Sequence, residues 1–189
     1  KRLNRDEISE LVPIMNSDVI VAAVLEPGAM DLDVNALHQG FLRGCAARGG
    51  ELHLNTEVLE LSRQDGVWHA ETPSGTYTAP TVINAAGAWV DTVAELAGVA
   101  PLGVVPKRRT VFTFRTPDEF PCADWPLVID ASEEYYFKAS GGFLMVTPAD
   151  ETPVPPSDVQ PEEIDVAIAV DRLEKNTCLK VGRIEHKWA

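Results

Sequence analysis

Residues 82–89 read Val-Ile-Asn-Ala-Ala-Gly-Ala-Trp, an apolar segment that runs directly into small residues and then into a tryptophan. The pattern predicts a short apolar strand over residues 81–84 and a helix that ends at Gly98, with apolar residues at helical spacing: Trp89, Val93, Leu96 and Ala97. Small residues at the end of a strand let a bulky ligand approach the backbone, and amides at a helix start can donate to it. Close packing of a helix on a sheet requires the same residue types, so both interpretations stay open.

Upstream of this segment, the sequence predicts a helix followed by an antiparallel meander. The helix is capped by Asp31 or Asp33, stops at Gly49-Gly50 and carries apolar residues on one face: Val34, Leu37, Phe41, Leu42 and Cys45. Turn sequences at 64–66 and 73–75 separate three alternating segments, and a further strand precedes them; the predicted strands are 51–55, 57–61, 67–72 and 75–79. The order of helix, strand, meander, strand, glycine turn and helix indicates an α/β arrangement over residues 27–100.

The flanking segments, residues 1–26 and 101–189, are expected to form a second domain. A short helix over 5–15 and a buried strand over 19–25 open the chain. Beyond Pro101 the sequence is rich in strand patterns, at 108–114, 127–130, 135–138, 143–147 and 178–184. An amphipathic helix is expected over 162–175, with Pro161 at its first position. The predicted fold therefore combines a partial α/β domain with an α+β domain that has a large antiparallel or mixed sheet flanked by helices.

Composition excludes several classes of function. The formal net charge of −13 leaves no basic face for nucleic acid or an anionic membrane. The three cysteines include no Cys-x-x-Cys pair, which argues against a disulfide framework or a thiolate metal site and fits a reduced, cytoplasmic setting. No histidine pair has metal-ligand spacing, and neither a Gly-x-Ser-x-Gly elbow nor a P-loop is present. The longest apolar run, Val19–Leu25, is far shorter than a membrane span.

The segment Asn84-Ala85-Ala86-Gly87-Ala88-Trp89 after an apolar strand, with Asn55-Thr56-Glu57-Val58 and the meander, resembles the D-amino acid oxidase-like family of FAD-dependent oxidoreductases. The resemblance covers essentially the whole chain. Further motifs are most similar to its D-arginine dehydrogenase branch: residues 31–33, 37–40, 43–44, 106–109, 124–126 and 185–189. The resemblance implies that residues 27–100 belong to a FAD-binding domain, and that 1–26 with 101–189 form a substrate-binding domain.

The resemblance also implies which residues meet the cofactor. Val58 matches the position whose backbone lies against the adenine end of FAD, and Ala86, Gly87 and Trp89 match the turn beside the flavin. Trp89 has a structural alternative, because a large aromatic residue at a helix start is commonly part of a core. The Gly-x-Gly-x-x-Gly motif that holds the FAD pyrophosphate in this family is absent from these residues. The chain is therefore expected to be an internal fragment that neither binds FAD tightly nor turns over substrate alone.

Two residues match the family's substrate contacts, namely Arg109 and Tyr136. A guanidinium suits a substrate carboxylate because its planar fork makes two parallel hydrogen bonds. Side chains alternate along a strand, so Arg108 must face away from Arg109, and Tyr135 must face away from Tyr136. Without the resemblance, a solvated basic strand end and core tyrosines are the simpler interpretations. Replacement of Arg108 is accordingly expected to be mild.

For the intact protein, the resemblance implies hydride transfer from a D-amino acid to the flavin, which yields an imino acid and then a 2-oxo acid. The acidic loop with Asp130, Glu133 and Glu134 would favour a cationic substrate such as D-arginine, although a solvated loop explains it equally well. No catalytic side chain and no metal are expected, and the electron acceptor is a quinone or oxygen. A bacterial, cytoplasmic enzyme is implied, with a peripheral position at the inner membrane as the alternative. Oxidation of glycine, sarcosine or 2-hydroxyglutarate, or a non-catalytic binding domain of this fold, are the competing hypotheses.

Overall fold

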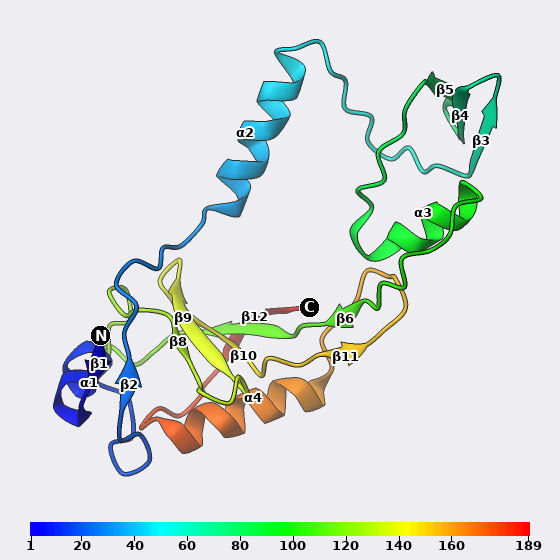
Figure 1. Cartoon of the computed structure of the whole chain (residues 1–189). Coiled ribbons are helices and arrows are strands. Elements are labelled where there is room, and N and C mark those ends of the chain that lie inside the picture. Colours follow the sequence, from blue (N-terminus) through cyan, green and yellow to red (C-terminus); the bar gives the residue numbers. More distant parts are fainter. The chain divides into compact units, whose positions relative to one another are not determined.

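The computed structural model describes residues 1–189. The chain divides into two compact units (Figure 1): unit 1 comprises Lys1–Pro27 and Val105–Ala189, and unit 2 comprises Gly28–Val104. The domain boundaries expected from the sequence, 26/27 and 100/101, fall close to these divisions. The assignment of one unit to substrate and the other to cofactor stays a prediction.

Unit 1 is built on a five-stranded sheet in the order β12-β7-β10-β9-β8, in which every pairing is antiparallel. Its strands are β7 (Val111–Phe114), β8 (Val128–Ile129), β9 (Tyr136–Ser140), β10 (Phe143–Thr147) and β12 (Ile184–Trp188). Two small antiparallel pairs accompany it: β1 (Arg2–Leu3) with β2 (Ala23–Val24), and β6 (Lys107–Arg108) with β11 (Thr152–Pro153). The turn between β9 and β10 uses Gly141 and Gly142, both at positive φ, which explains a tight hairpin there.

Helix α4 (Glu163–Asn176) runs along one face of this sheet (Figure 1) and closes the core of unit 1. Its buried apolar residues Val166, Ala169 and Leu173 recur at helical spacing and belong to the same cluster as the buried side chains of the sheet: Phe112, Phe114, Phe137, Leu144 and Val146. Each large side chain of this kind contributes about 1.5–3 kcal/mol when it leaves water. The short helix α1 (Arg5–Leu11) begins with a capping box between Asn4 and Glu7.

Unit 2 contains α2 (Val34–Ala46), the meander β3 (Glu60–Gln64), β4 (Val67–Thr72) and β5 (Gly75–Ala79), a 3₁₀ turn (Gly87–Trp89) and α3 (Val90–Leu96). The Asp33 side chain caps α2 by accepting a hydrogen bond from the Ala36 amide. Helix α3 packs against β3, with Ala94 and Leu61 buried. No other residue of this unit is buried.

The mixed α/β fold class is confirmed, as are the helix after Asp33, the three-stranded meander, the helix ending at Gly98 and the strand Phe143–Thr147. The sheets themselves are antiparallel throughout, without a parallel pairing. Gly98 has φ +64°, the left-handed conformation that terminates a helix. These elements are set by caps, turns and alternation within a few residues of one another, which explains why the sequence predicts them.

The strands predicted over residues 51–55 and 81–84 are wrong, because both segments are irregular and exposed. A strand is defined by its ladder, and no other segment of this chain pairs with either of them. The predicted buried strand 19–25 is also wrong: only Ala23–Val24 pairs, and Val19 and Val21 are more than half exposed, at 51% and 58%. An apolar run without a packing partner stays in contact with water.

Several element boundaries differ from the predictions: the strand expected over 108–114 is divided into β6 and β7, the helix expected over 5–15 ends at Leu11, and the strand expected over 57–61 is Glu60–Gln64. The last strand is Ile184–Trp188 rather than 178–184, because the Cys178 amide instead donates to the Ile14 carbonyl (2.8 Å) and Leu179 enters the core. Pro161 precedes the N-cap residue Glu162 and is not the first helical residue of α4. None of the helices is long and apolar enough to cross a membrane.

Candidate functional site

The bend at residues 84–89 is held by the side chain of Asn84. Its Nδ2 donates to the Val90 carbonyl (2.8 Å), and its Oδ1 accepts a hydrogen bond from the Ala86 amide (3.2 Å). The Trp89 amide donates to the Ala86 carbonyl (3.0 Å), which closes the 3₁₀ turn. One amide side chain therefore fixes the path of the backbone through the residues predicted to lie beside the flavin.

Gly87 is the most constrained residue of this bend. Its φ is +57°, where a side chain is strained, and a Cβ placed on it would have nothing within 4 Å. Ala86 is half-buried, and Trp89 is 45% exposed, so Trp89 is not a core residue of this chain. Val58, the other residue predicted to contact the cofactor, is half-buried just before β3. The bend thus presents small residues and backbone with open space beside the glycine.

A carboxylate that sequence reasoning missed anchors the helix after the bend. Asp91 accepts three hydrogen bonds from the amides of Leu102, Gly103 and Val104, at 2.8, 2.9 and 2.8 Å. Gly103 has φ +79°, which helps the three successive amides to converge. The only local signal in the sequence was an acidic residue in the first turn of a helix. Such a residue ordinarily indicates a favourable interaction with the helix dipole, and it does not predict hydrogen bonds to amides outside the helix.

In unit 1, Arg109 lies in the break between β6 and β7, and Tyr136 is the first residue of β9. Arg108 contacts Asp165 of α4, whereas the Arg109 guanidinium contacts the segment that follows β10. Phe137 belongs to the core, and its neighbour Tyr136 faces away from α4. The register Tyr136↔Thr147 and Val146↔Phe112 places Tyr136 at the end of the sheet where β7 begins. Arg109 precedes β7 by two residues, so both predicted carboxylate contacts lie near this end of the sheet.

The Arg109 guanidinium is fixed by two oxygens of the segment after β10. Its Nε donates to the main-chain carbonyl of Asp150 (2.9 Å), and its Nη2 donates to Glu151 Oε1 (3.2 Å). The side chain is 41% exposed, so its other donors can reach a ligand. Glu151 also pairs with Lys107 Nζ (2.6 Å), and this hydrogen bond is the main reason that the pKa of Glu151 lies below its usual value.

Arg108 is buried, in contrast to the solvated strand end considered above. Its Nη1 donates to Glu162 and its Nη2 donates to Asp165 Oδ2 (2.7 Å), both at the start of α4. The hydrogen bond that Arg108 donates to Glu162, and then the charge of Asp165, raise the pKa of this guanidinium above its ordinary value despite burial. Arg108 therefore joins β6 to α4, and the expectation that its replacement is mild has no support in its surroundings.

The two adjacent tyrosines have different environments, as their alternation predicts. Tyr135 is 2% exposed and stacks near Phe137, with ring centroids 6.5 Å apart, in the core. Burial, and secondarily the charge of Asp130, raise its pKa to about 12. Tyr136 is only half-buried. Of the pair, Tyr136 is the hydroxyl that a ligand can reach.

The acidic loop shares a cavity with residues of α4 and with Asp150 and Glu151, the two residues that bind Arg109. Glu133 and Glu134 line a shallow cavity of about 470 Å³ together with Asp150, Glu151, Asp165 and Arg172. Arg172 donates to the main-chain carbonyls of Glu134 and Pro148, the latter at 2.9 Å, and its Nε lies 3.8 Å from the Glu134 carboxylate. The chain's own arginine therefore already faces this loop. No group of three or more histidine, cysteine or acidic side chains is arranged to hold a metal ion.

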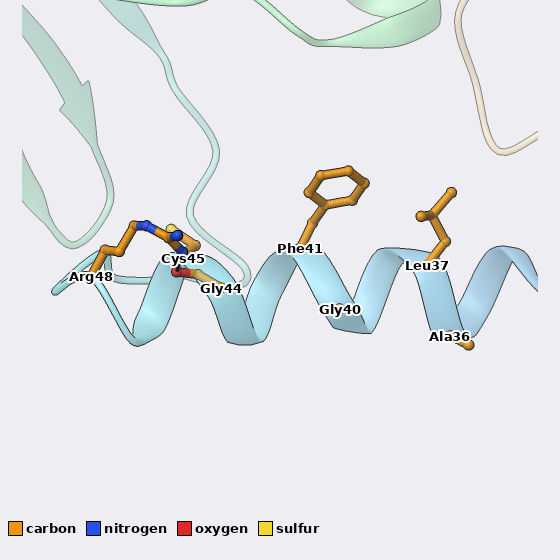
Figure 2. Close-up of a pocket in the computed structure, with 7 residues that line it drawn as sticks. All are labelled: Ala36, Leu37, Gly40, Phe41, Gly44, Cys45 and Arg48. Carbon is orange, nitrogen blue, oxygen red and sulfur yellow. Dashed lines mark hydrogen bonds between the residues drawn. The ribbon is translucent and has the colours of Figure 1, made fainter.

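Helix α2 carries an exposed apolar face. Leu37 and Phe41 project from the same side of the helix (Figure 2), and they are 52% and 72% exposed. The hollow of about 570 Å³ found there is lined only by α2 and Arg48, so it is a helix face and not an enclosed binding site. The periodicity that predicts α2 also predicts a buried face, which this chain does not bury.

The whole chain matches one protein family. The family model described as FAD dependent oxidoreductase (DAO) matches residues 1–189. The chain belongs to this family. Among curated relatives, mitochondrial dimethylglycine dehydrogenase of Rattus norvegicus is 29% identical over 145 residues, and mitochondrial sarcosine dehydrogenase of Homo sapiens is 27% identical over 161 residues. These matches cover 76% and 80% of the chain but 17% of each relative, so the chain spans a small part of their length.

A solved structure of this FAD-dependent oxidoreductase fold agrees over all residues. The L-α-glycerophosphate oxidase from Mycoplasma pneumoniae, described with FAD bound, matches with a TM-score of 0.84 at 18% identity. It covers 100% of this chain, and the chain covers 51% of it. At that identity the likeness concerns the fold.

The bend in unit 2 fits the cofactor of the family. A flat, bulky ring system needs backbone free of side chains, and Gly87 supplies it with open space where a Cβ would project. Ala86, Gly87 and Trp89 would lie beside the flavin, and the Val58 backbone would meet the adenine end. These four contacts stay predictions from the resemblance.

Proposed function

We propose that the full-length protein is an FAD-dependent oxidoreductase that oxidises the carbon–nitrogen bond of a small amine or amino acid bearing a carboxylate. The observation that carries the proposal is the placement of Arg109, two residues before β7, and Tyr136 near the same end of the five-stranded sheet, in a chain of this family. A guanidinium with free donors and a reachable phenol hydroxyl make a pair suited to one carboxylate.

The flavin would supply the chemistry by accepting a hydride from the carbon that bears nitrogen. Arg109 would bind the substrate carboxylate through its planar fork, while Tyr136 donates a further hydrogen bond to it. Fixing the carboxylate limits the positions open to the α-carbon, which lowers the entropic cost of reaching a reactive geometry. The oxidised product, an imino acid, then takes up water and releases ammonia to give a 2-oxo acid.

Within this class, our finer proposal is a D-amino acid with a cationic side chain, such as D-arginine. The resemblance at residues 31–44 and 106–109 supports it. The acidic loop supports it less, because Arg172 already faces Glu134. Reoxidation by a quinone or oxygen and a cytoplasmic location belong to the same proposal.

A second candidate is oxidation of an N-methylated glycine. The two relatives named above are dehydrogenases of dimethylglycine and sarcosine. Both substrates carry a carboxylate, so the roles of Arg109 and Tyr136 would be unchanged.

Flavin reduction by a panel of substrates separates these candidates. Full-length protein is mixed without oxygen with D-arginine, sarcosine, dimethylglycine, glycine or 2-hydroxyglutarate, and loss of flavin absorbance is followed. We expect bleaching by at least one carboxylate-bearing amine, with D-arginine fastest under the finer proposal. Bleaching by 2-hydroxyglutarate alone would assign the enzyme to hydroxy acids, and purified protein without flavin absorbance would favour a non-catalytic domain.

Gly87 allows a test of the predicted cofactor contact. Gly87→Ala in the full-length protein is expected to reduce FAD content, because strain at φ +57° shifts the bend away from its bound conformation. Gly98→Ala is the matched control: Gly98 also has positive φ (+64°) and open space for a Cβ, so its backbone cost of about 1 kcal/mol should be similar. The ratio of flavin to protein absorbance and the thermal midpoint are measured for both. Equal loss of flavin in the two variants would argue against a contact at Gly87.

A further inference from the structure

Asp150 makes contact with three consecutive residues around the predicted substrate arginine. Its main-chain carbonyl accepts the hydrogen bond from Arg109 Nε (2.9 Å). Its carboxylate accepts from Thr110, at 2.6 Å from the amide nitrogen and 3.0 Å from Oγ1. On the other side, Arg108 Nε lies 3.8 Å from Oδ2.

The Asp150 side chain is buried, and its surroundings explain its position. Its exposed fraction is 8%, that of Arg108 is 6%, and Thr110 is fully buried. Ala149, just before it, has φ +55°, a strained conformation for a residue other than glycine. The carboxylate bonds to Thr110 hold this segment in place, because a buried acceptor without a donor is unfavourable. The carbonyl of Asp150 is thereby aimed at Arg109.

An anchored arginine binds a carboxylate more readily than a mobile one. A free arginine side chain samples many rotamers, and that freedom is lost on binding. A hydrogen bond that already fixes Nε leaves the terminal nitrogens to form contacts at a smaller entropic cost. The exposed Glu151 contributes a second contact, but it also pairs with Lys107 and is 56% exposed.

We propose that Asp150 is a positioning residue for Arg109, which rests on the proposed role of Arg109 in carboxylate binding. Asp150 does not touch the substrate in this account. It fixes Thr110 through its carboxylate and Arg109 through its carbonyl, and so sets the direction of the guanidinium before substrate arrives.

The test measures KM, kcat and FAD content of full-length variants, with whichever of D-arginine, sarcosine, dimethylglycine and glycine reduces the flavin fastest. Asp150→Ala is expected to raise KM about five- to tenfold with kcat little changed, because binding loses its preorganised partner. Asp150→Asn keeps an acceptor for the Thr110 amide and should restore most of the affinity. Thr110→Val, which removes one hydrogen bond at nearly constant shape, should raise KM about threefold. Asp158→Ala, an exposed carboxylate in the following loop, is the control and should change nothing.

Two readouts separate positioning from general destabilisation. In the Arg109→Ala background, Asp150→Ala should have no further effect on KM, since the residue it positions is gone. Modification of Arg109 by phenylglyoxal, followed by mass spectrometry without any substrate, should be about three- to tenfold faster in Asp150→Ala than in the parent.

The outcomes distinguish the two proposals. Unchanged phenylglyoxal reactivity of Arg109, or additive effects of the two substitutions, would overturn the role of Asp150. Faster modification with no dependence of KM on Arg109 would leave the anchor in place and overturn the carboxylate site instead. If Asp150→Ala does not fold, Thr110→Val and Asp150→Asn supply the same comparison.

Discussion

Replacing Arg109 by alanine in the full-length protein is expected to raise KM about 30-fold or more, which corresponds to a loss of at least about 2 kcal/mol of binding. The physical reason is the loss of a charge-assisted, bidentate contact to the substrate carboxylate in a partly desolvated site. FAD content should not change, because Arg109 belongs to unit 1 and its printed partners, Asp150 and Glu151, lie there too. Steady-state kinetics and the flavin-to-protein absorbance ratio measure the two quantities.

The matched control for this prediction is Arg115→Ala. Arg115 directly follows β7, whereas Arg109 precedes it, and Arg115 is exposed with its guanidinium over the Phe143 ring at 4.6 Å. Its removal should change KM by no more than about twofold, since it lies at the other end of β7. A normal KM in Arg109→Ala would exclude Arg109 from the substrate site.

Replacing Arg108 by alanine is expected to cause the largest loss of stability among the single changes considered. The substitution removes the cation that pairs with Asp165, a residue that is only 8% exposed. It also removes the ion pair of Glu162 at the start of α4. Removing one partner of a buried ion pair is far more harmful than removing an exposed pair, because the remaining charge stays desolvated. We expect the thermal midpoint to fall by roughly 10 °C.

Thermal or denaturant unfolding followed by circular dichroism measures this effect. Arg183→Ala serves as the comparison, since Arg183 is 85% exposed and its nearest carboxylate oxygen, on Glu185, is 3.9 Å away. Its unfolding midpoint should remain within about 2 °C of the parent. Equal midpoints for the two variants would mean that the ion pairs of Arg108 contribute no net stability. Buried ion pairs can be neutral in this way, because hydrophobic residues in their place sometimes stabilise a protein equally well.

Local patterns predicted the elements whose stabilising partners are close in sequence. Helix α2 begins at the Asp33 cap, α3 ends at Gly98 in the left-handed conformation, and the meander turns at Asp65-Gly66 and Gly75, all at positive φ. Each of these features depends on hydrogen bonds or dihedral preferences within a few residues. The predictions of strands at 51–55 and 81–84 were wrong because a strand needs a second segment to pair with. The local sequence pattern does not say whether such a segment lies beside it.

The candidate site shows the same division. Alternation predicted different surroundings for Arg108 and Arg109 and for Tyr135 and Tyr136, and their surroundings do differ, although only Arg108 and Tyr136 lie in strands. The partners of those side chains were not predictable, because Asp150 and Glu162 are 41 and 54 residues from the arginines that they bind. For that reason the sequence predicted a mild effect of replacing Arg108. In the structure, Arg108 is buried and its ion pairs connect β6 to α4.

The residues of this chain therefore carried its family, its fold class, the start of α2 and the end of α3, because motifs and caps are properties of neighbouring residues. Three features emerged only from the folded chain: the burial of Arg108, the anchoring of Arg109 by Asp150, and the amides of residues 102–104 gathered around Asp91. Each joins groups at least 11 residues apart in sequence. Such contacts depend on how the helices and strands pack together. That packing depends on all the side chains of the close-packed interior and not on any one segment.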